Sequence, residues 1–297
     1  MQESIGEGGG GETREDHMEE SIGGGGGTMR FSDEIALPVE GLNKSEIYHV
    51  AKEVIGFVLY MHQQIPAVLQ HLEKDFDNLR EEYKDLEESV LPPEESKACS
   101  LRMRKLKIRE VKQGIKRLAK LMNTISSLLS SLQLMLDEIP VVHGLMLLLG
   151  GSLIRPQFVY EIFFLRGKAD SGNPRDSNKS KVAESVSKKV VRSLITKGAG
   201  GGSYAGPMKL FLLVKGPDNL KLPLHFLPKR EFKYHKKAVS FRLQIRCSAQ
   251  KRARDNSRFS AQEGGSTELY NTTSGDLIWF QCKHIVKGLA TKAPSAE

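Results

Sequence analysis

Two glycine-rich stretches are the sequence features closest to phosphate-binding loops. Gly150 and Gly151 end an apolar run, but no Gly-Lys-Ser or Gly-Lys-Thr follows them, as a P-loop requires. The stretch "GAGGGSYAG" at 198–206 is as rich in glycine as a dinucleotide-binding loop. It follows a predicted helix, however, whereas the dinucleotide loop follows a strand. Neither stretch therefore predicts a nucleotide site.

The nucleophiles and histidines form no constellation typical of catalysis or metal binding. Ser152 lies outside a G-x-S-x-G turn. None of the eight histidines pairs with a second histidine or a cysteine at metal-ligand spacing. We interpret His143 and His284 as strand residues and His62 as a helix-surface residue. The sequence thus predicts a protein that is not an enzyme, without a catalytic residue, metal site or cofactor.

The charge distribution indicates partners of opposite charge. Residues 1–40 carry two of the 44 basic and ten of the 36 acidic side chains, so residues 41–297 keep 42 basic and 26 acidic ones, a formal charge of +16. Such a surface attracts nucleic acid or an acidic protein surface. The three cysteines have no metal-like spacing, and we expect them to be reduced in a protein of the nucleus and cytoplasm: Cys99, Cys247 and Cys282.

Glycine repeats distinguish the N-terminus from the rest of the chain. The motif "ESIG" occurs at 3–6 and again at 20–23, each time followed by glycines, and this composition cannot build a core. We expect a disordered, acidic, glycine-rich tail over 1–40, one folded domain over 41–290 and a flexible C-terminus over 291–297.

Apolar residues at steps of three and four predict three helices in the first half of the chain. The first begins near Ser45, a candidate N-cap, and is kinked or interrupted at Pro66. The other two, around 69–90 and 108–136, have a period of 3.5 residues, which indicates an antiparallel helical hairpin. One helix is acidic and the first half of the other is basic, so we expect opposite charges to face each other. Nucleic-acid binding by the basic run is the alternative.

The second half of the chain reads as apolar strands joined by polar loops. The run at 144–150 is apolar throughout, which indicates a central strand buried on both faces. A helix at 182–197 places Val190 and Leu194 on its inner side. Further strands are predicted at 158–167, 208–216, 239–247 and 277–286. This order predicts an α+β fold with helices backing a mainly antiparallel sheet.

Three stretches together resemble the comet family of HORMA-like adaptors. They are "VLYMHQQIP" at 58–66, "LMLLLGGSLIRPQFVYEI" at 145–162 and "DLIWFQCKHIVKGL" at 276–289, in the family's order. The resemblance implies a HORMA-like fold and a partner that is a closed HORMA protein, either the spindle-checkpoint protein Mad-two or a protein of the meiotic chromosome axis. It also implies recruitment of a Pch-two-type AAA+ ATPase that reopens the HORMA partner, which silences the checkpoint in mitosis.

The resemblance implies positions for the HORMA contact. The short central helices of the two partners would pack side by side. Met61 falls where the family's first helix carries a glutamine, and Val191 falls where the family has an aromatic contact residue. Helical spacing places Arg192 and Ile195 beside Val191 on the outward face. These four residues are the predicted HORMA-binding positions.

The resemblance also implies a docking position for the ATPase. Pro228, Lys229 and Arg230 match the family's ATPase-contacting Pro-Lys pair, inside the basic segment "FLPKREFKYHKK" at 226–237. Proline fixes its own φ and cannot continue a sheet ladder, so we expect a rigid, exposed loop or sheet edge here.

A basic module that binds nucleic acid or chromatin is the alternative class of function. It is based on the charge of +16 and on the "KRAR" patch at 251–254. No recognised nucleic-acid-binding motif and no aromatic–basic interleaving on a sheet face accompany these features. We also expect no membrane association, since the apolar run before Arg155 is far shorter than the ~20 residues of a spanning helix.

Overall fold

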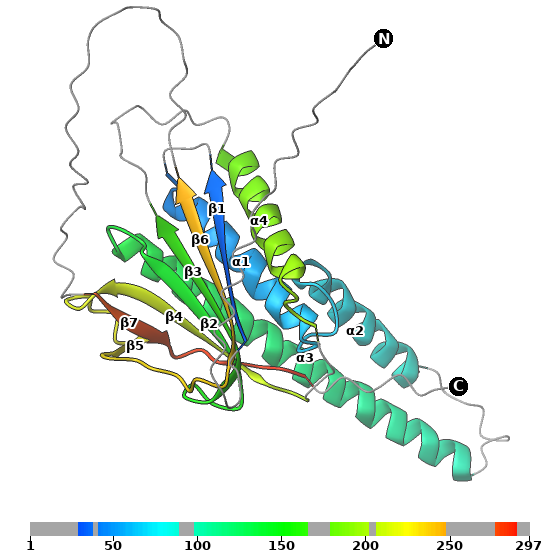
Figure 1. Cartoon of the computed structure of the whole chain (residues 1–297). Helices are drawn as coiled ribbons and strands as arrows, with labels where there is room; N and C mark the ends of the chain where they lie inside the picture. The colour runs from blue at the N-terminus through cyan, green and yellow to red at the C-terminus, as the bar shows by residue number, and fades with distance from the viewer. Residues whose placement is uncertain are drawn as a thin grey trace, which may run out of the picture.

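The structure is a computed structural model that describes residues 29–37, 41–88, 98–165, 179–201, 206–247 and 277–289. It has the predicted α+β class (Figure 1). The elements, in chain order, are β1 (Arg30–Leu37), α1 (Lys44–Met61), the 3-10 helix η1 (Leu69–His71), α2 (Leu72–Glu88), α3 (Ala98–Glu138), β2 (Gly144–Gly150), β3 (Pro156–Leu165), α4 (Lys179–Thr196), β4 (Lys209–Pro217), β5 (Phe226–Lys229), β6 (Val239–Cys247), β7 (Leu277–Cys282) and β8 (Val286–Lys287).

The strands of the described residues form one mixed sheet in the order β1-β6-β3-β2-β4-β7-β5, with β8 paired to β4. Strand β2 lies at its centre, antiparallel to β3 and β4, and all seven of its residues are buried. The predicted central strand is therefore confirmed, and it forms an antiparallel hairpin with β3. The β1–β6 and β3–β6 pairings are parallel and the others antiparallel, so the sheet is mostly antiparallel, as expected.

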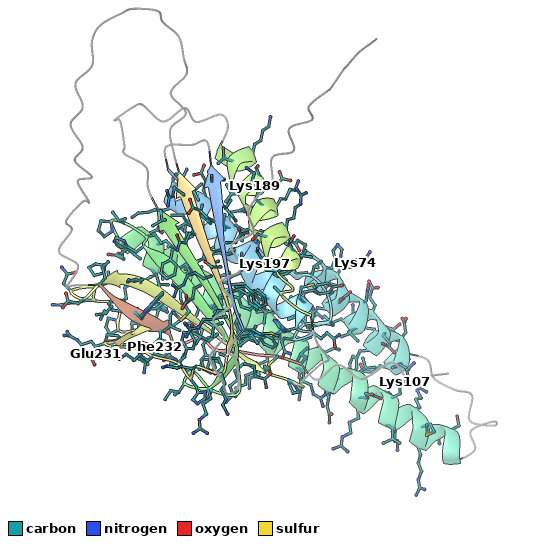
Figure 2. The ribbon with its side chains drawn as sticks, viewed as in Figure 1. Lys74, Lys107, Lys189, Lys197, Glu231 and Phe232 are labelled. Carbon is teal, nitrogen blue, oxygen red and sulfur yellow. The ribbon has the colours of Figure 1, made fainter. Side chains whose placement is uncertain are left out.

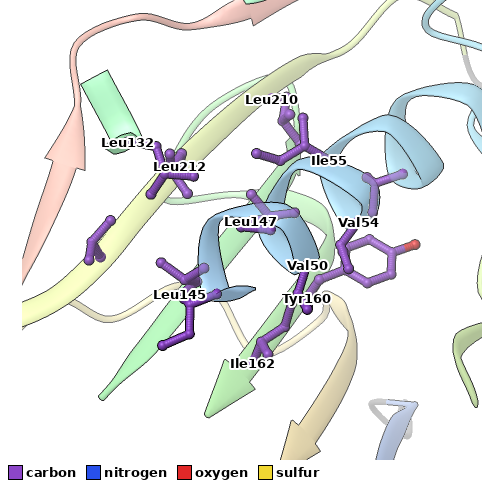
Figure 3. Close-up of a cluster of buried hydrophobic side chains, with 14 of the residues drawn as sticks. Val50, Val54, Ile55, Leu132, Leu145, Leu147, Tyr160, Ile162, Leu210 and Leu212 are labelled. Carbon is purple, nitrogen blue, oxygen red and sulfur yellow. The ribbon is translucent and has the colours of Figure 1, made fainter. Parts of the chain in front are cut away.

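Helices α1 and α3 cover one face of the sheet and build the main core with it (Figure 1). Val50, Val54 and Ile55 of α1 lie over the strands in Figure 3 and are fully buried. Burial of each such side chain contributes about 1.5–3 kcal/mol. The sheet side of this contact consists of Leu145, Leu147, Tyr160, Ile162, Leu210 and Leu212.

The opposite face of the sheet is covered by the segment between β5 and β6. Phe232 and Tyr234 of this segment pack on a second cluster that includes Met146, Leu148, Val159, Phe211 and Leu213. The Tyr234 hydroxyl donates to Glu161 at 3.2 Å, and burial together with this carboxylate raises the pKa of Tyr234 to about 12. The basic segment at 226–237, predicted to be an exposed loop or sheet edge, thus also packs two aromatic side chains on this face of the sheet.

Strand β1 corrects the predicted boundary of the N-terminal tail. Residues 30–37, assigned to the tail, pair with β6 in parallel along their whole length, and Ile35 and Leu37 are buried. Arg246 and Glu34 form an ion pair of 2.8 Å across this pairing. The folded domain therefore begins near residue 30 rather than 41. Residues 1–28 and 291–297, predicted to be disordered and flexible, lie outside the described residues.

The N-cap of α1 lies two residues before the expected one, Ser45. Asn43, rather than Ser45, caps the helix: its side chain accepts from the Glu46 N–H at 2.9 Å, and the Glu46 carboxylate accepts from the Asn43 N–H at 2.8 Å. This reciprocal pair is a capping box. The helix ends at Met61, before Pro66.

Helices α2 and α3 form the predicted antiparallel hairpin, which extends beyond the sheet (Figure 1). Arg104 donates to the Leu86 carbonyl at 2.6 Å, and Lys107 lies 3.3 Å from Glu82. Phe76 and Leu79 of α2 pack against the main core. Opposite charges meet at the Lys107–Glu82 pair, but most basic residues of α3 lie elsewhere on the helix.

Candidate protein-binding site

A groove of about 660 Å³ lies between α1 and α4. The two helices lie side by side and run in the same direction, with His49 near Glu184 at one end and Met61 beside Gly200 at the other (Figure 1). The residues that line the groove are His49 and Glu53 of α1 and Glu184, Ser187, Lys188, Val191, Arg192, Ile195 and Thr196 of α4.

The two sides of α4 have different roles. Val190 and Leu194 are buried in the main core, as their spacing predicted. Val191 is half-buried at the groove, whereas Arg192 and Ile195 are exposed, with 54% of Ile195 open to solvent. The predicted outward face is therefore confirmed as a surface, and three of the four predicted HORMA-binding residues are brought together there.

The groove combines a small apolar floor with charges of both signs. Glu184 and Lys188 form an ion pair of 2.7 Å one helical turn apart, and this cation lowers the pKa of the Glu184 carboxyl. Glu53 of α1 and Arg192 of α4 add one charge of each sign. Two carboxylates and two cations leave this surface without a net charge, so it lacks the positive field that attracts a polyanion and suits a folded protein partner better.

A hydrogen bond to β1 fixes the orientation of α4. Ser193 donates through its hydroxyl to the Asp33 carboxylate. Since Ser193 follows Arg192 directly, this contact sets how far the groove side of α4 turns outward. Strand β1, which sequence patterning missed, is thus part of the support of the groove.

Met61 is not among the residues that line the groove. It is half-buried at the end of α1, under the turn that follows α4. A Cβ at Gly200 would lie 2.7 Å from the Met61 Cβ, and Gly200 has φ +81, so glycine is needed there on both grounds. Met61 is therefore not part of the groove, and its contact with a partner stays a prediction.

Pro228, Lys229 and Arg230 lie at the sheet edge formed by β5, in agreement with the expected edge position. Pro228 pairs with Phe280 of β7 and is exposed, and Lys229 is half-buried. Arg230 is exposed and lies 3.8 Å from Asp218, a long and weak ion pair. The exposed Leu227 adjoins these residues, so the edge presents an apolar side chain beside its cations.

The groove and the β5 edge lie at opposite ends of the sheet. Strand β1, which contacts α4, is the first strand in the sheet order, and β5 is the last. Figure 2 shows the same separation, with Lys189 of α4 on one side and Glu231, next to the β5 edge, on the other. One macromolecule can therefore occupy each surface at the same time.

His62, Tyr160 and Gln64 form a buried polar cluster next to the end of α1. The interpretation of His62 as a helix-surface residue was therefore wrong. His62 is 8% exposed and shares a hydrogen bond of 2.6 Å with the Tyr160 hydroxyl. Burial lowers the pKa of His62 to about 4 and raises that of Tyr160. The sequence signal for burial was the position of His62, four residues after the buried Val58.

The buried Gln64 is the second member of this cluster that the sequence did not reveal. Its amide donates to the His62 carbonyl at 2.6 Å and to the Gly206 carbonyl at 3.2 Å, and its oxygen accepts from the Met208 N–H at 2.6 Å. The Gln64 carbonyl accepts from the Leu289 N–H at 2.9 Å. These contacts tie the C-terminal segment to the loop after α1.

Within the described ranges, no three side chains among histidine, cysteine, aspartate and glutamate are placed to hold a metal ion. None of the described helices has the length and apolar character needed to span a bilayer. Comparison with known proteins gives no identification, since no protein-family model and no curated protein matches the chain.

Proposed function

We propose that this protein is a non-enzymatic, comet-type adaptor with a HORMA-like fold. It binds a closed HORMA-domain protein at the groove between α1 and α4. It presents that protein to a Pch-two-type AAA+ ATPase that docks at Pro228, Lys229 and Arg230. The client is a Mad-two-like checkpoint protein or a HORMA protein of the meiotic axis, and the site of action is the nucleus and cytoplasm.

The observation that carries the proposal is the convergence of Val191, Arg192 and Ile195 on one open groove. The resemblance to the comet family implies a partner contact at Val191, and helical spacing places Arg192 and Ile195 on the same face of α4. Arginine is enriched in protein interfaces, and the exposed Ile195 and half-buried Val191 supply apolar area beside Arg192. A helix laid along α4 would cover all three.

The β5 edge suits an acidic protein surface. Lys229 and Arg230 supply the charge, and Leu227 supplies an exposed apolar contact next to them. Because the groove lies at the other end of the sheet, a HORMA client would leave this edge free. An adaptor needs two such independent surfaces.

The HORMA contact is tested by reversing the charge of Arg192. We expect Arg192→Glu to weaken binding of a closed HORMA protein at least tenfold, measured by calorimetry, with an unchanged melting temperature. Lys189→Glu is the matched control, since Lys189 is an exposed cation of the same helix that does not line the groove. Equal affinities of both variants would refute the groove as the HORMA site.

The ATPase contact is tested in parallel with Pro228→Ala, Lys229→Ala and Arg230→Ala combined. We expect loss of ATPase recruitment and retention of HORMA binding. The association rate of the unmodified protein with the ATPase should fall as salt rises, because the screening length is about 8 Å at physiological ionic strength. Survival of ATPase binding in the triple variant, or loss of both partners together, contradicts a two-surface adaptor.

A further inference from the structure

Five basic side chains form a line along the first half of α3. We call this line the basic ridge. Its members recur at steps of three, four, seven and four residues, which keeps them on one side of a helix, and each is exposed. Over 18 residues the line is about 27 Å long at 1.5 Å per residue. The basic ridge consists of Arg102, Lys105, Arg109, Lys116 and Lys120.

The acidic helix α2 does not neutralise the basic ridge. The cations that contact α2 are Arg104, Lys107 and Lys112, the last lying over the Tyr83 ring at 5.8 Å. At 100° per residue, Arg109 lies roughly 140° around the helix from Arg104, so the ridge faces away from α2. Within the described part of the chain, no ridge side chain forms an ion pair or a hydrogen bond; the Lys120 carbonyl, on the backbone, accepts from the Thr124 hydroxyl at 2.8 Å. The acidic residues of α2 therefore meet only those cations of α3 that lie on the side facing α2.

The ridge is held on a rigid support. Val111 and Leu118, on the other side of α3, are buried, and the hairpin extends beyond the sheet (Figure 1). Figure 2 shows long side chains that project from this helix into solvent, with Lys107 labelled between the two helices of the hairpin. A partner can therefore approach the ridge without contact with the groove or the β5 edge.

We propose that the basic ridge binds the phosphate backbone of duplex DNA. This site is additional to the proposed adaptor function and does not depend on it. Among the exposed residues beside the ridge, Leu106 is apolar and 59% exposed. The five ridge side chains are all charged, whereas the core of an interface with a folded protein is depleted of charge. The ridge contains no aromatic side chain on which unpaired bases could stack, so single strands are disfavoured.

Duplex DNA matches the ridge in charge and in length. Each of its strands carries a phosphate every 3.4 Å along the axis, so a straight ridge of about 27 Å spans roughly eight phosphates of a strand. Lysine and arginine contacts to phosphate position a protein on DNA without reading its sequence. We therefore expect binding that is independent of base sequence and that depends strongly on salt.

The test measures the affinity of the full-length protein for a labelled 20-base-pair duplex by fluorescence anisotropy between about 50 and 200 mM salt. Five phosphate contacts give a log–log salt slope of about −4.5, hence a loss of about 500-fold over this range. Lys105→Ala, Arg109→Ala and Lys116→Ala combined should reduce the slope to about −1.8 and the loss to about tenfold. Alanine keeps the helix intact.

The matched control removes three exposed lysines elsewhere: Lys181, Lys189 and Lys221, each changed to alanine. Its net charge equals that of the ridge variant, so it should keep a slope of about −4.5 if the ridge is the site. Equal slopes for the two variants would overturn the proposal, since binding would then follow net charge alone. Circular dichroism and melting temperature establish that each variant is folded.

Competition distinguishes duplex DNA from other polyanions. Unlabelled duplex DNA should displace the probe at lower concentrations than poly-glutamate, duplex RNA or vesicles that contain phosphatidylserine. Stronger displacement by poly-glutamate would instead assign the ridge to an acidic protein surface and overturn the proposal. Stronger displacement by the RNA or the vesicles would overturn it in the same way.

Discussion

At the residue scale, Gln64 joins segments that are far apart in the sequence. Its fully buried side chain bonds the His62 carbonyl in the loop after α1, and the Gly206 carbonyl and Met208 N–H ahead of β4. Gly288 passes so close that a Cβ there would lie 2.0 Å from the Gln64 side-chain oxygen. Because the Gln64 backbone carbonyl also accepts from the Leu289 N–H, the loop after α1, the residues ahead of β4 and the C-terminal segment meet at one residue.

Replacing Gln64 should destabilise the whole domain. Gln64→Leu has similar size but leaves the Met208 N–H and the His62 and Gly206 carbonyls without these partners. We expect the free energy of unfolding to fall by about 2–4 kcal/mol, measured by chemical denaturation. Gln70→Leu is the control, because Gln70 is exposed and should change stability by no more than about 0.5 kcal/mol. Similar losses for both would show that the amide contacts are unimportant.

His62 should make the stability depend on pH. Its pKa is about 4 in the folded protein and 6.5 in the unfolded chain, because burial disfavours the charged imidazolium. Below pH 6.5 the unfolded chain binds a proton at His62 that the folded state excludes. The contribution of neutral His62 to the free energy of unfolding is therefore fully present above pH 6.5 and is lost as the pH falls toward 4. Between pH 7 and pH 5 this loss is about 2 kcal/mol.

The measurement compares unfolding free energies of the unmodified protein and of His62→Gln across this pH range. Carboxylates titrate in both proteins, so the difference between the two curves isolates the imidazole. A constant difference from pH 7 to pH 5 would contradict a buried, neutral His62.

At the element scale, the α2–α3 hairpin depends on its apolar seam more than on its charges. The Lys107 and Glu82 side chains are 58% and 41% exposed, and exposed ion pairs contribute about 0.2–1 kcal/mol. Leu79 packs against the main core from α2. The seam also fixes the direction in which the basic ridge points.

Truncation of the seam should therefore cost more than removal of the ion pair. We expect Leu79→Ala to lower the free energy of unfolding by about 2 kcal/mol and Glu82→Ala by no more than about 0.5 kcal/mol. Thermal denaturation of both variants in the same buffer provides the comparison. Comparable losses would mean that the hairpin is held together by charge.

The elements that sequence patterning predicted are those whose pattern is local. The stripe of α4 separated Val190 from Val191 correctly, and the apolar run of β2 indicated burial on both faces. Strand β1 was missed because Asp33 interrupts its alternation of apolar residues, and the reason for Asp33 is a hydrogen bond to Ser193, 160 residues away. No local pattern contains such a contact.

In the candidate site, too, local sequence patterns predicted some positions, and contacts between distant residues determine the others. Val191, Arg192 and Ile195 could be assigned to one surface from their spacing on a single helix. The position of Met61 depends on packing under Gly200, and the direction of the basic ridge depends on which side of α3 meets α2. Both are properties of tertiary packing, which composition and periodicity do not determine.

At the scale of the whole molecule, the boundary of the domain can be tested by truncation. Removal of residues 1–28 leaves every described contact of β1 in place, so we expect an unchanged melting temperature. Removal of residues 1–37 deletes β1, including the buried Ile35 and Leu37 and the Asp33 support of α4. We expect a loss of about 3–6 kcal/mol in the free energy of unfolding, since each buried aliphatic side chain contributes about 1.5–3 kcal/mol. Identical melting curves for the two truncations would place β1 outside the folded unit.

The parallel pairing of β1 with β6 also has a consequence for the order of events during synthesis. Arg30 pairs with Ser240, so the first strand of the chain has no neighbour until some 210 more residues have been made. At about 5–20 residues per second, the ribosome needs roughly 10–40 s for that length. Strand β6 is also the link between β1 and β3, so from the synthesis of β3 until that of β6 the nascent protein holds two strands without their β6 neighbour. Strand pairing between distant residues is slow and exposes the edges of such strands to aggregation, and this chain is most vulnerable to aggregation before it leaves the ribosome.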